Sequence, residues 1–280
     1  MAAPLSIETF ARRRRELVAR MPHRSAALFV ATPPASRNAD VVYPYRPDSD
    51  LWYLTGCDEP SAALLLTRGC DAPESALFLR DRDPKAEQWT GRRIGVADAP
   101  DHFGVEVAFP IDKLASELPA AVKRARTLIY RPSRASELTA AVDAGLEAVR
   151  GGPRGPHKGP HEVLDPTLTL HELRMLKSDE EVALIRSANH ITEEGFRAVM
   201  ADSHPGSGEW ELQATLEAAF RGRGGWGWAY PTIVASGPRA CVRHYDSNAQ
   251  RAREGDLVLI DAGAEVEGYG ADISRTFPAS

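Results

Sequence analysis

Two carboxylates in the last quarter of the chain are the first residues that could do chemistry. Asp261 follows the apolar run 257–260 and precedes an Ala-Gly pair. This pattern predicts a buried strand that ends in a carboxylate, where an ionised group without a partner would be costly. Asp272 comes eleven residues later, and the segment 265–270 between the two is typical of a hairpin turn.

Two strands joined by such a hairpin would bring Asp261 and Asp272 side by side. Adjacent carboxylates need a cation or a shared proton between them, and oxygen ligands favour Mg²⁺, Mn²⁺ or similar ions over copper. A turn or capping role is the alternative for each aspartate, since Asp before Gly is common in turns. The sequence alone leaves both interpretations open.

One histidine, His244, lies shortly before the carboxylate strand in the sequence His-Tyr-Asp-Ser-Asn. An imidazole titrates near neutrality and can therefore move a proton or carry charge; a surface or hydrogen-bonded core histidine is the alternative. The sequence contains no Gly-x-x-x-x-Gly-Lys-Ser/Thr loop, no His-Glu-x-x-His and no Gly-x-Ser-x-Gly. Nothing therefore indicates a nucleotide cofactor or a serine nucleophile.

The elements that must position these residues can be predicted from local patterns. Ser178 stands three residues before Glu181, which predicts a capping box at the start of a long helix that reaches about residue 200. A second helix is expected over 207–220, and strands are expected over 232–235, 257–260 and 271–277. A further helix, over 168–177, should precede all of these elements.

The first part of the chain alternates apolar, strand-like runs with helical patterns. The expected strands are 26–31, 62–66, 75–79 and 127–130, and the expected helices are 113–125 and 136–150. Alternation of this kind predicts an α/β sheet domain. A first helix, with Ile7, Phe10 and Leu17 turned inward and its arginines in solvent, should precede the sheet.

Residues 151–160 contain seven Gly or Pro in ten, so neither a helix nor a central strand is expected there. We place a linker at this segment. The predicted domains are therefore 1–155 and 156–280, and the fold class is α/β (α+β).

Bulk composition narrows the class of protein. The net charge of −5 argues against nucleic acid as a partner, because phosphate binding needs a basic face. No run approaches the ~20 apolar residues that span a bilayer, so no membrane is expected. Three cysteines, an odd number in a chain without a recognisable export signal, predict reduced thiols and a cytoplasmic location.

Several motifs in order resemble one family. Residues 230–237, 244–248, 255–263 and 268–278 are similar to the metallopeptidases of the pita-bread fold, and within them to the aminopeptidase P group. The first half agrees independently, since residues 38–60, 88–95 and 103–105 look like the N-terminal domain of that group. The resemblance covers nearly the whole chain and implies an N-terminal α/β domain followed by the first half of a pita-bread catalytic domain.

The resemblance also implies roles for particular residues. Asp261 and Asp272 match two of five ligands of a pair of divalent metal ions, usually manganese. His244 matches a catalytic histidine that contacts substrate, and Tyr230 matches a residue of the same pocket. Trp89 and Arg154 match substrate-site residues that reach the active site of a neighbouring subunit, so a homo-oligomer is expected.

The implied activity is that of an Xaa-Pro aminopeptidase, a metalloaminopeptidase that hydrolyses the peptide bond before a penultimate proline. Proline-containing peptides are then the substrates, and metal-assisted attack of water is the reaction. A prolidase that cuts only Xaa-Pro dipeptides is the near alternative. A non-catalytic peptide-binding module of the same fold is the alternative from another class.

The sequence departs from the family pattern at its end. The family places a histidine and two glutamates, the other three ligands, beyond the Thr-Phe-Pro motif, after which this chain ends at Ser280. We therefore expect the C-terminal half of the catalytic domain to be absent and this chain alone to be inactive and unstable. A C-terminal fragment of the same protein or a second chain would complete the site.

Overall fold

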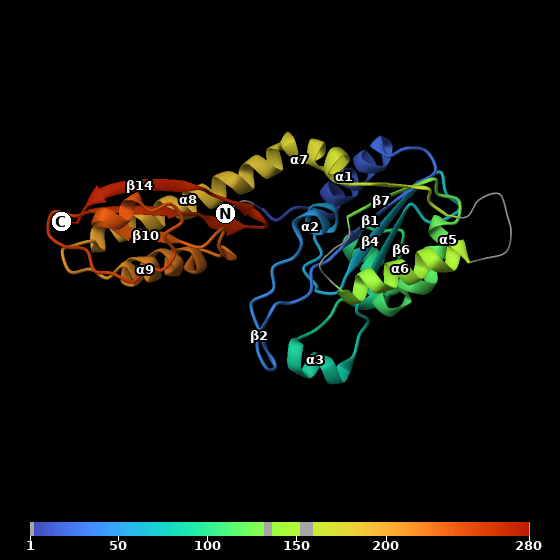
Figure 1. Cartoon of the computed structure of the whole chain (residues 1–280), viewed down its shortest axis with the longest axis horizontal. Coiled ribbons are helices and arrows are strands. Elements are labelled where there is room, and N and C mark those ends of the chain that lie inside the picture. Colours follow the sequence, from blue (N-terminus) through green and yellow to red (C-terminus); the bar gives the residue numbers. More distant parts are fainter. Residues whose placement is uncertain (1–2, 132–135, 152–158, 280) are drawn as a thin grey trace. The chain divides into compact units, whose positions relative to one another are not determined.

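The computed structural model describes residues 3–131, 136–151 and 159–279. The described chain forms two compact units, which divide between Leu176 and Lys177 (Figure 1). We refer to Leu5–Leu176 as the N-terminal unit and to the part from Lys177 onward as the C-terminal unit. The mixed α/β fold class predicted from the sequence is confirmed.

A six-stranded mixed sheet forms the centre of the N-terminal unit. Its strand order is β6-β5-β4-β1-β7-β8, with β1 antiparallel to β4 and parallel to β7. The strands are β1 (Ser25–Val30), β4 (Ala63–Arg68), β5 (Ser75–Leu79), β6 (Val107–Pro110), β7 (Thr127–Tyr130) and β8 (Glu162–Leu164). The four strands predicted from apolar runs are confirmed as β1, β4, β5 and β7.

Helices cover both faces of this sheet, because its strands are apolar on both sides. In β1, Ala27 and Phe29 belong to one core cluster, whereas Leu28 and Val30 belong to the other. The first cluster takes in side chains of α1 (Ile7–Arg20), α2 (Ser49–Thr55) and α4 (Gly95–Phe103). The second takes in side chains of α5 (Leu114–Val122) and α6 (Ser136–Arg150) (Figure 1).

Exposed elements of the N-terminal unit are among those that escaped prediction. The hairpin of β2 (Ser36–Asn38) and β3 (Val41–Val42) is exposed throughout, and α3 (Pro84–Thr90) has no buried residue. Elements without a buried face lack the periodic apolar pattern on which prediction depends.

The boundary between the two units lies later than the Gly/Pro-rich segment 151–160 suggests. The chain after that segment returns to the sheet, since β8 pairs in parallel with β7, and a turn over Thr167–His171 leads into α7 (Glu172–Met175). Leu170 and Leu173 of this stretch are buried in the core. A Gly/Pro-rich segment ends regular structure, but packing decides to which unit the following residues belong. Most of the predicted linker, residues 152–158, lies outside the described residues.

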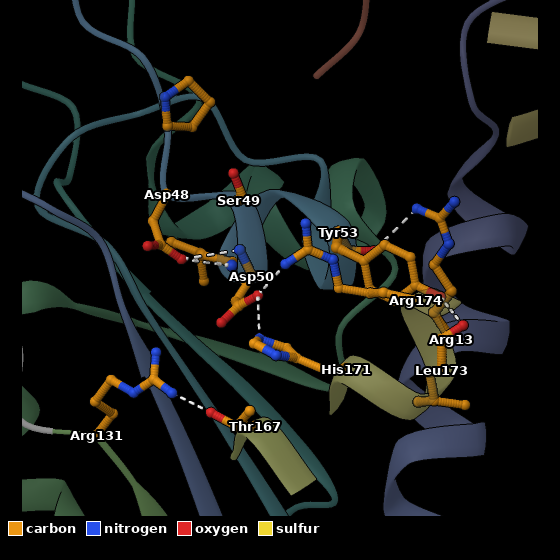
Figure 2. A network of polar contacts seen from close by, with 12 residues as sticks. Arg13, Asp48, Ser49, Asp50, Tyr53, Arg131, Thr167, His171, Leu173 and Arg174 are labelled. Atoms are coloured by element: carbon orange, nitrogen blue, oxygen red, sulfur yellow. Dashed lines mark hydrogen bonds and ion pairs between the residues drawn. The ribbon is translucent and has the colours of Figure 1, made fainter. Parts of the chain in front are cut away.

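Polar contacts hold the same stretch against α2. Asp50 forms an ion pair with Arg174 and lies 3.9 Å from the Nε2 atom of His171, as Figure 2 shows. The ring of Tyr53, on the same helix, lies between two guanidinium groups, 4.0 Å from that of Arg13 and 5.8 Å from that of Arg174. Tertiary contacts therefore make residues up to Leu176 part of the N-terminal unit.

The arginines of α1 are not all in solvent, contrary to expectation. Arg13 and Arg14 are buried, whereas Ile7, expected to point inward, is 48% exposed. Arg14 donates to the carbonyl oxygens of Leu54 at 2.7 Å and Phe103 at 3.1 Å, which end α2 and α4, and also to that of Gly104. The last carbonyls of a helix lack partners inside the helix, so a buried guanidinium is a suitable cap for two helix ends at once.

Replacement of Arg14 by methionine should lower the free energy of unfolding by about 3 kcal/mol, because buried carbonyl oxygens lose a charged donor. The matched control is Arg15→Met on the same helix. Arg15 is exposed and forms an ion pair with Glu8, which is also exposed, so less than about 1 kcal/mol should be lost. Urea denaturation followed by circular dichroism measures both, and equal losses would contradict the capping role.

The C-terminal unit begins with two helices. The predicted capping box is confirmed: Ser178 and Glu181 cap α8 (Asp179–Asp202) reciprocally. The helix expected over 207–220 is present as α9 (Glu209–Gly222), with Gly208 at its N-cap. Over the residues that the structure describes, no helix combines the length and the apolar character needed to cross a bilayer.

Two small antiparallel sheets follow these helices. One has the order β10-β11-β14, and the other has the order β13-β12-β9. Their strands are β9 (Gly227–Trp228), β10 (Ile233–Ser236), β11 (Leu257–Ala262), β12 (Ala264–Val266), β13 (Tyr269–Gly270) and β14 (Ile273–Pro278). The three strands predicted in this part of the chain are confirmed as β10, β11 and β14.

One face of strand β11 is buried and the other is open. Val258, Ile260 and Ala262 are fully buried, whereas Leu257 is 53% exposed and Asp261 is half-buried. Ser236, which pairs with Val258, donates a hydrogen bond to the first residue of α9, so the buried face is turned toward that helix. Because neighbours along a strand alternate between faces, Asp261 lies on the face away from α9.

The junction between β11 and β12 allows no side chain. A Cβ atom on Gly263 would lie 1.8 Å from the carbonyl oxygen of Ala271. This close approach lets the N–H of Ala271 donate to the carbonyl oxygen of Ala264 at 2.9 Å. Gly263 therefore permits the hairpin of β12 and β13 to fold back so that Asp272 follows close to the end of β11.

Replacement of Gly263 by alanine should destabilise the protein by about 3 kcal/mol, because a backbone oxygen occupies the space that the new methyl group needs. Gly222→Ala at the end of α9 is the control, since nothing lies within 4 Å of its added Cβ. That change should be neutral or slightly stabilising. Unfolding free energies from urea titration decide the matter, and similar values for the two variants would refute the close-approach argument.

Candidate metal centre

A pocket opens at the end of β11 in the C-terminal unit. Its volume is about 460 Å³, within the range of small-molecule sites. The residues that line it are Tyr230, Pro231, Ile233, His244, Asp246, Asp261 and Asp272. Four residues singled out from the sequence are thus brought together: Tyr230, His244, Asp261 and Asp272.

One phenol hydroxyl bridges the two aspartates. The hydroxyl oxygen of Tyr230 lies 2.6 Å from Oδ1 of Asp261 and 3.0 Å from Oδ1 of Asp272. Burial raises the pKa of Tyr230, and the hydrogen bond and negative charge of Asp261, then those of Asp272, raise it further. Tyr230 is therefore a neutral donor whose single proton serves two carboxylates.

Strand register places the two carboxylates next to each other. Asp261 pairs with Ser274 of β14, and Asp272 stands two residues before Ser274. Residues two apart in extended chain point to the same side, so Asp272 faces the pocket together with Asp261. The predicted side-by-side arrangement is present, although the hairpin of β12 and β13 belongs to a second sheet.

The chemistry of these donors fits a hard divalent cation. Two carboxylates converge on the same small space, and the neutral hydroxyl between them balances no charge. Carboxylate oxygens are the ligands that Mg²⁺ and Mn²⁺ prefer, and a cation between the aspartates would relieve their repulsion. Within the described residues, no group of three or more His, Cys, Asp or Glu side chains is placed to hold a metal ion.

His244 reaches the pocket from the loop between β10 and β11. The loop starts with a turn of 3₁₀ helix over Gly237–Cys241. The backbone of His244 is left-handed, with φ of 51°, a conformation that costs a non-glycine residue about 1 kcal/mol or more. Contacts elsewhere in the loop must therefore hold this residue in place.

The two remaining predicted site residues do not contribute to the pocket as described. Trp89 lies on α3 of the N-terminal unit, where it is 89% exposed. Its role at a neighbouring subunit stays a prediction. Arg154 lies outside the described residues, so its role also stays a prediction.

Sequence reasoning missed three residues of the pocket. Asp246 stands two residues after His244, and that spacing was a usable signal. Ile233 pairs with Asp261 across β10 and β11, and Pro231 precedes the same strand. Only the register between strands identifies these two, because their sequence pattern is that of ordinary strand residues.

Two families match this chain in order. Residues 10–130 match the aminopeptidase P N-terminal domain, and residues 183–280 match metallopeptidase family M24. Metallopeptidases act through bound metal, which agrees with the carboxylate chemistry of the pocket.

Relatives with the same domain order are similar along almost the whole chain. It is 39% identical to the Xaa-Pro aminopeptidase of Escherichia coli over 277 residues, and 37% identical to that of Haemophilus influenzae over 278. Those alignments cover 99% of this chain and 63% and 62% of the two relatives. The chain thus spans less than two thirds of the length of these relatives.

A solved structure agrees with the sequence comparison. The zinc-substituted E. coli aminopeptidase P in complex with product superimposes with a TM-score of 0.95 at 39% identity, over 99% of this chain and 63% of that one. Both domains and their order are therefore those of aminopeptidase P structures. The chain thus consists of an aminopeptidase P N-terminal domain followed by sequence of metallopeptidase family M24 with the pita-bread fold, and it is similar along almost its whole length to aminopeptidase P structures.

Proposed function

We propose that this protein is an Xaa-Pro aminopeptidase, which releases the first residue of a peptide whose second residue is proline. The observation that carries the proposal is the convergence of Tyr230, His244, Asp261 and Asp272 on one pocket of a chain that is similar to aminopeptidase P. Bound divalent metal would supply Lewis-acid chemistry, activating water and polarising the scissile carbonyl.

Each residue of the site has its own role in this proposal. Asp261 and Asp272 would hold the metal, and among the hard cations that carboxylate oxygens favour we assign manganese, the ion that the resemblance implies. The hydroxyl of Tyr230 donates a hydrogen bond that the two carboxylates share, and this bond restricts their rotation. His244 meets the substrate at the scissile bond, where an imidazole can donate to the oxygen that gains charge.

The pocket also suggests how a proline ring is received. Pro231 and Ile233 present apolar surface beside the carboxylates. An amide before proline has no N–H, so the pocket needs no acceptor for that group. Apolar walls next to a polar centre therefore favour a proline-containing peptide over an ordinary one.

Location and assembly follow as further parts of the proposal. Cys57, Cys70 and Cys241 are all free thiols, which supports a reducing, cytoplasmic environment. Exposed Trp89 supports a homo-oligomer, because a large apolar ring in water gains from burial at a subunit contact.

The activity is tested with three synthetic peptides and the full protein loaded with Mn²⁺. We expect release of the first residue from an Xaa-Pro-Yaa tripeptide, and no release from the matched Xaa-Ala-Yaa peptide. His244→Ala should lower kcat by about 100-fold with little change in KM, because its donor acts on the transition state. Amino-acid release is followed by mass spectrometry.

The same assay separates the alternatives. Cleavage of an Xaa-Pro dipeptide without cleavage of the tripeptide would indicate a prolidase. Tight binding of the tripeptide without cleavage, unaffected by Asp272→Ala, would indicate a peptide-binding module. Either result would overturn the proposed function.

Metal binding is tested separately from turnover by titration with Mn²⁺, observed by electron paramagnetic resonance. Asp261→Asn and Asp272→Asn should each weaken Mn²⁺ binding by at least about tenfold, since even groups behind the ligands contribute that much at metal sites. Asp246→Asn is the control, because it removes the same charge from the same pocket. Equal weakening in all three variants would mean that net charge, rather than ligation, attracts the ion.

A further inference from the structure

One buried carboxylate in the C-terminal unit has no role in the proposed chemistry. Glu209 is the first residue of α9 and is only 1% exposed. It does not line the pocket of Asp261 and Asp272. Because burial of a carboxylate is costly unless it is well bonded, its partners indicate what it does.

The partners of Glu209 all belong to the end of β10 or to the loop that carries His244. Oε1 accepts from the backbone N–H of Ser236 at 2.8 Å and from its hydroxyl at 2.7 Å. Oε2 accepts from the hydroxyl of Tyr245 at 2.9 Å and from the backbone N–H of Gln250 at 2.9 Å. Arg239 adds an ion pair at 3.6 Å.

These partners are spread along the loop in a particular way. Ser236 is its first anchor and Gln250 its last, while Tyr245 lies near the middle, directly after His244. A single carboxylate therefore ties the start, the middle and the end of the loop to the N-terminus of α9. The helix N-terminus itself favours a negative charge at this position.

The ionised form of Glu209 is the one that suits these donors. Burial alone raises the pKa of this carboxyl, but hydrogen bonds from Ser236, Gln250 and Tyr245 outweigh it, so the pKa lies below its ordinary value. A charged acceptor makes each of these bonds stronger than a neutral one would.

The loop needs such an anchor because its backbone is strained. His244 and Asn248 both have positive φ, 51° and 44°. Asn248 is held independently, since its side chain accepts from the N–H of Val234 and donates to the carbonyl oxygen of Thr232. The hydroxyl of Tyr245, which belongs to the residue directly after His244, is thus a contact that can hold the left-handed backbone of His244.

We propose that Glu209 is a positioning residue, which acts through Tyr245 to aim His244 into the pocket of Asp261 and Asp272. This inference rests on the proposed function for its catalytic consequence. The anchoring itself depends only on contacts within this chain and can be measured without substrate.

Hydrogen exchange tests the anchoring directly. Glu209→Gln should raise the exchange rates of amides in 237–250 by about tenfold or more, because the neutral amide bonds these donors poorly. The control is Glu211→Gln in the same helical turn. Glu211 accepts from the N–H of Gly208 and pairs with Arg251, whereas the hydroxyl of Tyr245 is bonded to Glu209. Mass spectrometry of loop peptides should show no change for the control, and an unchanged loop in Glu209→Gln would overturn the inference.

Kinetics with the Xaa-Pro tripeptide test the consequence, using Tyr245→Phe, which removes one hydroxyl and leaves Glu209 in place. This variant should lower kcat by about tenfold and leave KM within about twofold, because it displaces a group that acts in the transition state and leaves the pocket that binds the substrate unchanged. In the His244→Ala background, the same change should alter kcat by less than about twofold.

The outcomes separate this inference from the proposed function. An equal loss of kcat with and without His244 would show that Tyr245 acts by another route and would overturn the inference while leaving the aminopeptidase assignment intact. A wild-type protein that cleaves no Xaa-Pro peptide would overturn the assignment, and hydrogen exchange alone would then decide whether Glu209 anchors the loop.

Discussion

The pairing of β11 with its two neighbours is the contact on which the C-terminal unit depends. Its buried side chains, Val258, Ile260 and Ala262, attach the strand to the helical side, and this fixes which face Asp261 occupies. The register with β14 then determines that Asp272 stands beside Asp261 rather than behind the sheet. A slip of β11 by one residue would turn Asp261 to the opposite face and so away from Asp272, which means that the apolar residues of the strand indirectly control the site.

Each unit contains buried charged side chains that bond backbone groups without a hydrogen-bond partner in regular structure. In the N-terminal unit, Arg14 bonds the ends of two helices. In the C-terminal unit, Glu181 accepts from the N–H of Ser178 and from the hydroxyl of Tyr269, which connects the start of α8 to the hairpin between the two aspartates. Glu209 does the same for the loop of His244. Each charge is buried because several donors or acceptors need one common partner.

The candidate site is therefore assembled from several separate segments of the C-terminal unit. Asp261 comes from β11, Asp272 from the residue just before β14, Tyr230 from the segment before β10, and His244 from a loop held by α9. Groups from segments this far apart in sequence keep a common geometry only if each segment is braced separately. Gly263 contributes by the absence of a side chain, which lets the hairpin close tightly between the two carboxylates.

Residue patterns singled out His244, Asp261 and Asp272 as candidates, and the resemblance to a known family added Tyr230. The sequence by itself also determined the strands with continuous apolar runs and the capping box of α8. These features are local, since a buried strand or a helix start leaves its signature in adjacent residues. The tertiary structure alone decided the limit of the N-terminal unit at Leu176, the burial of Arg13 and Arg14, and the contacts of Glu209. The partners of Glu209 lie 27 to 41 residues along the chain, and no local pattern can show which distant donors a buried carboxylate will meet.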